Sequence, residues 1–259
     1  MSKTIIFIHG AWVTPSCWEN FQRRYEARGY TCIAPAWPFD ERPVAELNRS
    51  PASGLAAIGI REIVDSYAEK IKALPEPPIL VGHSFGGLFV QLLLDRGLGA
   101  AGVAIDPGPP RGVFPVPTAF RAALFVFLKW AGWRKVITMP FKAFQWGFAH
   151  TLPYAQQREA YDSQVVPTPG RIYYQLVLGI NAGVNFRNGE RAPLLLVAGE
   201  LDRTATASMV RAMYRKHSKS SAVTAFKAFA GRTHWLIASP GWEEIADESI
   251  AWVEQQLKR

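Results

Sequence analysis

Hydrophobic residues in this chain gather in short, continuous runs. IIFI at residues 5–8 and LLLVA at residues 194–198 show no polar alternation, which is typical of parallel strands that are covered on both faces. The pattern predicts six strands, at residues 4–8, 31–34, 78–81, 102–105, 194–198 and 222–229.

Helical periodicity fills most of the intervals between these strands. The predicted helices lie at residues 15–28, 55–74, 86–95, 205–217 and 242–257. Strands and helices that alternate at these lengths form right-handed βαβ units. We therefore predict an α/β fold with an open, mainly parallel sheet that is flanked by helices.

Residues 107–190 break this alternation. They contain no convincing buried strand, but they hold aromatic stretches with a helical pattern, such as FRAALFVFLKWAGW at residues 120–133. Five prolines between residues 107 and 117 keep the chain extended where it leaves the sheet. We expect one core domain, residues 1–106 and 191–259, and a helical cap, residues 107–190, inserted before the penultimate strand.

Charge is concentrated in the same segment. The 259-residue chain has a formal net charge of +8, and residues 107–190 contain nine Lys or Arg and three Asp or Glu, so they supply +6 of it. Basic runs are at most two residues long and nucleic-acid-binding motifs are absent, so we expect scattered solvated charges and no nucleic acid partner. A basic lid that favours anionic substrates stays open as an alternative.

Two cysteines, Cys17 and Cys32, are too few for a disulfide framework and favour a reducing compartment. The N-terminus shows no secretion signal, and no apolar stretch reaches the roughly 18 residues that a membrane span needs. We expect a cytoplasmic protein with a small-molecule substrate and no membrane span. The sequence makes no prediction of oligomeric state.

The run Gly82-His83-Ser84-Phe85-Gly86 follows an apolar strand and opens a helix. In that context G-x-S-x-G forms a nucleophile elbow, a tight turn that presents the serine hydroxyl. The two glycines let strand and helix approach each other, and the N-terminus of the helix favours negative charge near the hydroxyl. Ser84 is therefore the predicted nucleophile.

A serine nucleophile needs a histidine base, and the histidine needs a carboxylate that fixes its tautomer. His234 follows the last strand and is the predicted base, whereas His217 lies in a basic helix end, where it would serve the helix C-terminus. The loop after the penultimate strand supplies Glu200 and Asp202, and we predict Asp202 because it lies further into the loop. Asp106, at the end of the fourth strand, stays open as a rival.

The oxyanion of an acyl-transfer reaction needs two backbone donors. One follows the nucleophile, and the other lies in the loop after the first strand. The N–H groups of Phe85 and Ala11 fit these two places. His9 and His83 are expected to have structural hydrogen-bonding roles.

HGAW at residues 9–12, GHSFGG at residues 82–87, and GELDRT and GRTHW further on together resemble the α/β-hydrolase superfamily. Within it, HGAW followed by Cys17-Trp18 resembles the esterase and hydroxynitrile-lyase branch. The resemblance covers nearly the whole chain except residues 107–190. It implies an α/β-hydrolase fold and a Ser-Asp-His triad.

Departures from related families narrow the chemistry. Hydroxynitrile lyases of this type carry a threonine and a lysine where this chain has Gly10 and Trp235, so cyanide-releasing activity is not expected. Haloalkane dehalogenases and epoxide hydrolases use an aspartate nucleophile, which Ser84 replaces here. The histidines and cysteines show no zinc-ligand spacing, and no dinucleotide fingerprint follows the first strand, so neither metal nor cofactor is expected.

Together these features predict a serine hydrolase that cleaves a carboxylic ester of a small to medium, moderately hydrophobic substrate through an acyl-enzyme. Aromatic residues of the predicted cap would line part of the pocket, while most of them form the core of the cap. Three alternatives stay open: a lactonase or amidase with the same triad, a cofactor-free dioxygenase, and a slow-turnover ligand-sensing module.

Overall fold

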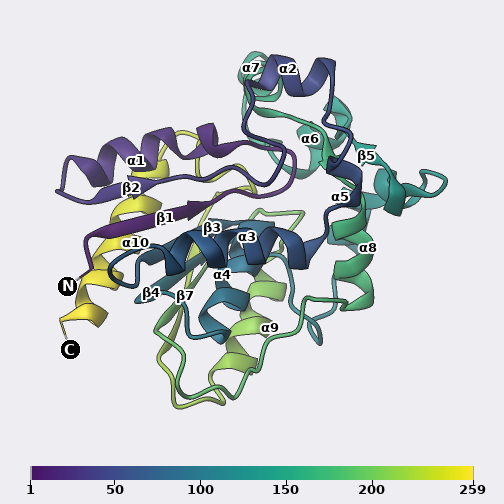
Figure 1. Ribbon diagram of the computed structural model, residues 1–259. Coiled ribbons are helices and arrows are strands. Elements are labelled where there is room, and N and C mark those ends of the chain that lie inside the picture. The colour runs from purple at the N-terminus through teal and green to yellow at the C-terminus, as the bar shows by residue number, and fades with distance from the viewer. Residues whose placement is uncertain (1, 259) are drawn as a thin grey trace.

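Six parallel strands form the central sheet of the computed structural model, which describes residues 2–258 (Figure 1). Their order is β2-β1-β3-β4-β7-β8, and each neighbouring pair is parallel. The strands are β1 (Thr4–Ile8), β2 (Thr31–Ile33), β3 (Ile79–His83), β4 (Ala101–Ile105), β7 (Leu194–Gly199) and β8 (Thr224–Phe229). The predicted α/β fold is confirmed, and all six carboxyl ends meet at one edge of the sheet, where such folds bind ligands.

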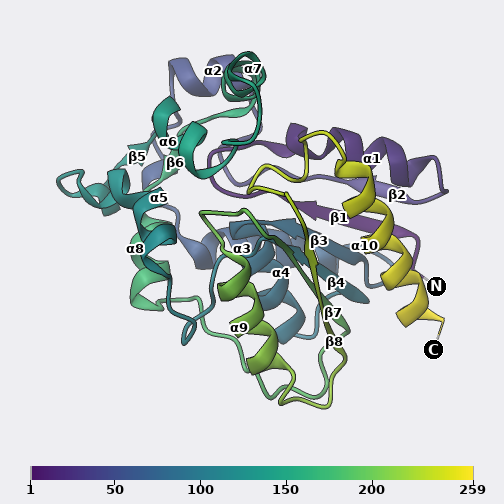
Figure 2. The same cartoon turned by 180° about the vertical axis from the view of Figure 1, so that it is seen from behind.

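Helices cover both faces of this sheet (Figures 1 and 2). One face carries α1 and α10, and the other carries α3, α4 and α9. Their bounds are α1 (Glu19–Glu26), α3 (Ile60–Lys72), α4 (Phe85–Asp95), α9 (Ala207–His217) and α10 (Trp242–Leu257). Short 3₁₀ helices, η1 (Pro15–Trp18) and η2 (Leu55–Ala57), precede α1 and α3, where the sequence predicted single longer helices.

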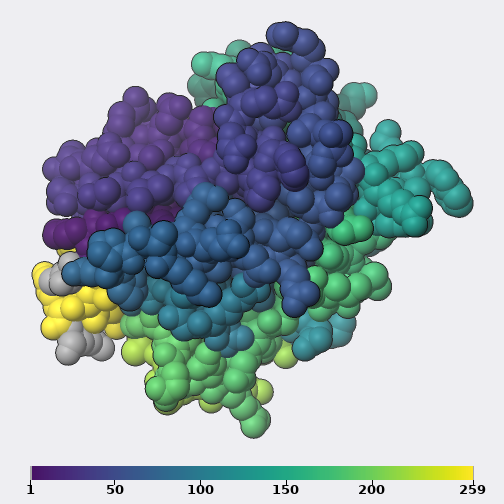
Figure 3. Space-filling view, viewed as in Figure 1, coloured from purple at the N-terminus to yellow at the C-terminus, as the bar shows by residue number. Residues whose placement is uncertain are grey.

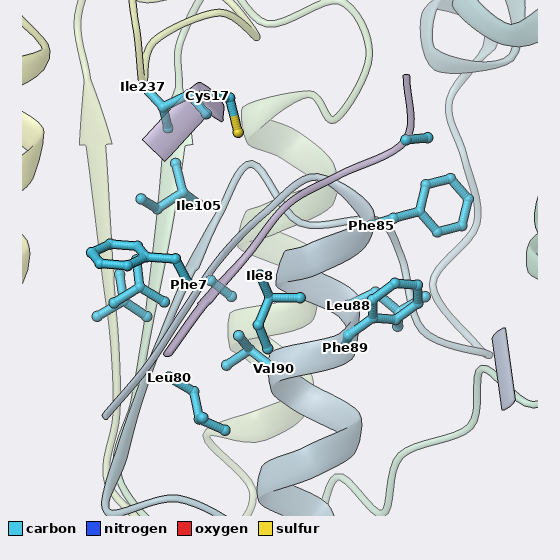
Figure 4. Packing of buried hydrophobic residues seen from close by; sticks show 14 of the residues in the cluster. Phe7, Ile8, Cys17, Leu80, Phe85, Leu88, Phe89, Val90, Ile105 and Ile237 are labelled. Atoms are coloured by element: carbon cyan, nitrogen blue, oxygen red, sulfur yellow. The ribbon is translucent and has the colours of Figure 1, made fainter. Parts of the chain in front are cut away.

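The helix α4 lies at the centre of the hydrophobic core. Its residues Leu88, Phe89 and Val90 are fully buried in one cluster with Ile8 and Leu80 of the sheet (Figure 4). A helix that is apolar on nearly every side must be enclosed by other elements. This enclosure fixes the N-terminus of α4, the end that adjoins Ser84.

Residues 107–190, which we call the insert, lie over the carboxyl edge of the sheet (Figures 1 and 2). They form α5 (Pro117–Phe127), η3 (Gly132–Arg134), β5 (Val136–Ile137), α6 (Phe141–Gly147), α7 (Tyr154–Gln164), β6 (Thr168–Pro169) and α8 (Arg171–Leu178). The chain then returns to the core at β7, the penultimate strand. The antiparallel pair of β5 and β6 was not predicted, because strands of two residues leave no periodic pattern.

A further helix outside the insert, α2 (Val44–Arg49), lies beside α7 in both views (Figures 1 and 2). Asn48 joins it to the insert, since its Nδ2 donates a hydrogen bond to the Val165 carbonyl at 2.9 Å. Only Leu47 of this helix is buried, so its sequence contains no apolar stripe from which to predict it. Within residues 2–258, each helix is too short or too polar to cross a lipid bilayer.

Candidate active site

Ser84 joins the end of β3 to the start of α4 in a strained conformation. Its backbone angles are φ +58° and ψ −121°, a region that costs a residue with a side chain of order 1–3 kcal/mol. The turn is tight enough to require glycine nearby. A Cβ atom on Gly86 would lie 2.0 Å from the Ile8 carbonyl oxygen, and one on Gly82 would lie 2.3 Å from the Gly86 carbonyl oxygen. The structure thus contains the elbow that G-x-S-x-G predicts.

The loop that follows β1 passes directly against this turn. A Cβ atom on Gly10 would lie 2.8 Å from the Ser84 Cβ atom, so only glycine allows the loop this approach. The next residue, Ala11, is buried. The backbone of the loop is therefore within reach of a group bound at the serine.

His234 and Asp202 are joined by a short hydrogen bond. His234 Nδ1 lies 2.6 Å from Asp202 Oδ2, and both side chains are completely buried. The other carboxylate oxygen of Asp202 accepts the N–H groups of Thr204 at 2.5 Å and Ala205 at 2.9 Å. Three donors on one carboxylate favour its ionised form and hold the imidazole with its proton on Nδ1.

This tautomer leaves Nε2 of His234 as the basic nitrogen. Nε2 is buried and has no hydrogen-bond partner among the described residues. The Ser84 hydroxyl also forms no hydrogen bond within residues 2–258, so nucleophile and base are not hydrogen-bonded in this structure. Catalytic hydrogen bonds are often long in unliganded enzymes and tighten when substrate binds.

Asp106, the rival acid, lies close to the same nitrogen without bonding it. Its Oδ2 is 4.0 Å from His234 Nδ1 and has no hydrogen-bond partner, while its Oδ1 accepts the Gly199 N–H at 2.7 Å. Burial, and next the negative charge of Asp202, raise the pKa of Asp106 well above its ordinary value. Burial thus favours the neutral form of Asp106 more than that of an exposed carboxyl group. Glu200, the third acid considered, is exposed and forms no ion pair or hydrogen bond with His234 within residues 2–258.

His83 and His9 hold backbone in place. His83 Nε2 donates to the His234 carbonyl at 2.8 Å, and burial lowers the pKa of His83 well below its ordinary value. His9 donates from Nδ1 to the Gly10 carbonyl at 2.9 Å and accepts the Trp37 N–H on Nε2 at 3.2 Å. This pattern requires a neutral ring, and burial lowers the pKa of His9 to about 4.

The expectation for His217 was wrong. Its side chain is buried rather than exposed at the end of α9, and Nε2 lies 3.1 Å from Gln91 Oε1. Burial, followed by the charge of Arg191, lowers the pKa of His217 to about 3. A neutral ring adds no charge to the helix C-terminus.

The two predicted oxyanion donors have no hydrogen-bond acceptor among the described residues. Neither the Phe85 N–H nor the Ala11 N–H forms a hydrogen bond within the described chain, residues 2–258. Phe85 is the first residue of α4, whose opening N–H groups have no partner inside the helix. Both donors are thus free to bind a developing negative charge.

The insert anchors the loop that carries one of these donors. Trp12 donates its N–H to Thr168 Oγ1 at 2.7 Å and its indole Nε1–H to the Ile137 carbonyl at 3.0 Å. Its carbonyl accepts the Val166 N–H at 3.0 Å, and its ring stacks on Tyr173 with 4.7 Å between centroids. Trp12 adopts φ +64°, a strained angle that these contacts hold. No sequence pattern points to Thr168, which lies far along the chain from Trp12.

An apolar cavity of about 70 Å³ connects Ser84 to the insert. Its wall contains no charged side chain. The lining residues are Ser84, Phe85, Gly108, Pro109, Pro115, Ala119, Phe120, Ala123, Phe127, Tyr173, Leu176, Val177, Thr204, Ala205 and Met209. This volume is smaller than the roughly 300–1,000 Å³ of a typical small-molecule pocket.

One group of buried side chains has the residue types of a metal site. Ligand atoms of His83, Asp106 and His234 all lie within 4.8 Å of one another. The Nδ1 proton of His234, however, is held by Asp202, so a metal ion at Nδ1 would have to displace that bond. The arrangement suits general base chemistry better than metal binding.

Comparison with known families identifies the family of the fold. The model of the alpha/beta hydrolase family matches residues 5–248. The chain belongs to the α/β-hydrolase family. No curated protein sequence matches it.

Solved structures share the fold of this α/β-hydrolase over nearly its whole length. A Paleococcus ferrophilus monoacylglycerol lipase is 18% identical, with a TM-score of 0.71 over 99% of this chain and 96% of the lipase. A pyrethroid hydrolase from Sphingobium faniae JZ-2 is 17% identical, with a TM-score of 0.72 and full coverage of both chains. An Arabidopsis methylesterase is 14% identical, with a TM-score of 0.71 over 97% of this chain and 98% of the methylesterase.

Proposed function

We propose that this α/β-hydrolase is a serine esterase in which Ser84, His234 and Asp202 form the catalytic triad. The observation that carries the proposal is the buried pair of His234 and Asp202, joined at 2.6 Å, with Nε2 of the histidine unpaired. The His234 ring lies 4.6 Å from the ring of His83, the residue that precedes the strained Ser84. A strained serine, an oriented imidazole and free backbone donors are the parts that acyl transfer requires.

In the proposed mechanism, Ser84 Oγ attacks the ester carbonyl carbon while His234 Nε2 takes the hydroxyl proton. The N–H groups of Ala11 and Phe85 stabilise the oxyanion of the tetrahedral intermediate. Nε2–H then protonates the leaving alcohol, which leaves an acyl group on Ser84. Water, deprotonated by the same nitrogen, releases the acid and restores the hydroxyl. Asp202 stays ionised throughout and stabilises the imidazolium.

The insert, residues 107–190, would act as the cap over this site. Its apolar cavity supports a moderately hydrophobic acyl group, because Phe120, Phe127 and Tyr173 line it without a charged side chain among them. The names of two similar structures, monoacylglycerol lipase and methylesterase, denote enzymes that act on esters and support the same bond type. We also propose the cytoplasm as the location, since both cysteines are free thiols.

The test is turnover of a p-nitrophenyl ester series of increasing acyl length, with the Ser84→Ala variant beside the unchanged protein. Loss of the nucleophile should lower kcat by about 10⁶-fold and abolish labelling by a fluorophosphonate probe. Ser163→Ala, which removes an exposed hydroxyl from α7, is the matched control and should change neither. Ester turnover that survives Ser84→Ala would reject the assignment and favour histidine chemistry that does not use the serine.

A further inference from the structure

The insert carries most of the large apolar side chains that the described residues expose. Thirteen are exposed in all, and ten of them lie in the insert. Nine of these form what we call the apolar patch: Phe114, Phe120, Leu124, Leu128, Trp130, Trp133, Val177, Leu178 and Ile180. Phe114 and Trp130 are 85% and 86% exposed, which no packing within this chain explains.

Aromatic contacts join the two helices that carry the patch. Phe127 of α5 contacts Phe120, with 5.3 Å between ring centroids, and Tyr174 of α8, with 5.2 Å. Tyr174 also contacts Trp133, at 5.6 Å, in the segment that follows α5. This segment projects from the rest of the molecule as the teal loop at the right of Figures 1 and 3. The patch therefore continues from α8 across α5 to a protruding tip.

The mouth of the catalytic cavity lies within this patch. Phe120 and Val177 line the cavity that contains Ser84, and both are also exposed, at 43% and 49%. An apolar chain that lies on the patch thus has an uninterrupted apolar path towards the serine.

Basic residues lie at both ends of the patch, and the segment that carries most of the patch contains no acidic residue. Residues 107–158 contain seven Lys or Arg and no Asp or Glu. Lys129, Arg134 and Lys135 are exposed next to Trp130 and Trp133, and none of the three forms an ion pair within residues 2–258. At the other end of the patch, Arg111 packs against Gly179, next to Ile180. The charges lie outside the cavity, so they do not select a small anionic substrate inside it.

We propose that the apolar patch docks the enzyme on a lipid surface with anionic headgroups. Exposed Trp, Phe and Leu side chains flanked by Lys and Arg are typical of proteins that insert into the headgroup boundary of a membrane. The segment 107–158, which carries cations and no acidic residue, complements a negatively charged membrane better than it complements an average protein partner. The docking itself does not depend on Ser84. Its consequence, delivery of a lipid-borne ester to the cavity, rests on the proposed function.

The experiment is co-sedimentation of the full chain with vesicles of phosphatidylglycerol and phosphatidylcholine in equal parts, and with phosphatidylcholine alone. Ser84→Ala is used throughout so that no lipid is hydrolysed. We expect binding to the anionic vesicles that weakens with salt. Adding Leu128→Ala and Trp130→Ala should weaken it by about tenfold or more, and adding Lys129→Gln and Lys135→Gln by about fivefold for each lysine.

The matched control adds Leu201→Ala and Val223→Ala, which remove exposed apolar side chains far from the patch in sequence, and should bind as Ser84→Ala does. With Ser84 present, the Leu128→Ala and Trp130→Ala variant should keep its turnover of a water-soluble short-chain ester, which shows an intact fold. No vesicle binding, or binding that the patch substitutions leave unchanged, would overturn the proposal. So would a dimer in solution that Trp130→Ala dissociates, because a second copy would then cover the patch. Neither result would alter the case for Ser84.

Discussion

Two buried carboxyl groups lie within reach of His234 Nδ1, and matched amide substitutions reveal which one carries the charge. Asp202→Asn and Asp106→Asn each replace a carboxyl group by an amide of the same shape. If Asp202 is the ionised acid, Asp202→Asn removes the acceptor that keeps the proton on Nδ1. Asp106→Asn exchanges one neutral group for another, and its amide oxygen can still accept the Gly199 N–H.

The number of hydrogen bonds that each carboxyl group accepts gives the expected size of the effect on kcat. Asp202 accepts three, from His234, Thr204 and Ala205, whereas Asp106 accepts one, from Gly199. Two additional bonds to a charged acceptor, at about 1.5–3 kcal/mol each, favour the charge on Asp202 by about 3–6 kcal/mol. We expect Asp202→Asn to lower kcat by about 10³ to 10⁴, and Asp106→Asn by less than about tenfold.

The assay is steady-state turnover of the best p-nitrophenyl ester, with thermal unfolding of each variant to show that the fold is retained. Asp106→Ala is informative as well, because it leaves the Gly199 N–H without an acceptor and should cost about 1–3 kcal/mol of stability. Equal losses of kcat in Asp202→Asn and Asp106→Asn would refute the reasoning, since they would mean that both carboxyl groups share the catalytic charge. A larger loss in Asp106→Asn would make Asp106 the acid.

Two further predictions concern the support of the site and the pH dependence of stability. Thr168→Val removes the acceptor of the Trp12 N–H, so we expect the unfolding free energy to fall by about 1–3 kcal/mol. We also expect kcat to fall rather than KM to rise. The control is Thr151→Val, at an exposed residue. An unchanged kcat would show that Trp12 needs no such anchor. Burial raises the pKa of Asp40 to about 7 in the folded protein. Because this carboxyl group ionises near pH 4 in the unfolded chain, the unfolding free energy should decrease as pH rises from about 4 to about 7. In denaturant unfolding at pH 8, the unfolding free energy of Asp40→Asn should exceed that of the unchanged protein by up to about 4 kcal/mol, with little difference at pH 4. The control is Glu41→Gln, at an exposed residue. A difference that is the same at both pH values, or that Glu41→Gln reproduces, would contradict the raised pKa of Asp40.

Much of the fold was predictable because its strands are buried on both faces. Continuous apolar runs placed β1 at its observed bounds and the other strands within two residues at each end, and helical periodicity placed α10 at its observed bounds. The helix α2 escaped prediction because Leu47 is its one buried residue, and the strands β5 and β6 because pairing of two residues leaves no pattern in sequence. These elements owe their form to contacts with distant segments.

Within the candidate site, local sequence context was sufficient to predict the tight turn at Ser84, because strand, glycines and helix are consecutive. The choice between Asp106 and Asp202 needed distances, since both follow strands that end at the same edge of the sheet. The sequence shows neither the 2.6 Å bond to Asp202 nor the 4.0 Å separation from Asp106. Thr168 could not be found either, because its partner Trp12 is 156 residues away.

The bond between Trp12 and Thr168 has a consequence for protein engineering. Caps are attractive units to exchange between related hydrolases when a new substrate range is wanted. Here the residue next to Ala11 takes its hydrogen-bond acceptor, and a stacking partner in Tyr173, from the segment that would be exchanged. A chimera that imports a foreign cap without an equivalent of Thr168 would therefore bind new substrates while the loop of Ala11, the proposed oxyanion donor, is no longer held in position. Cap and loop must be transplanted together.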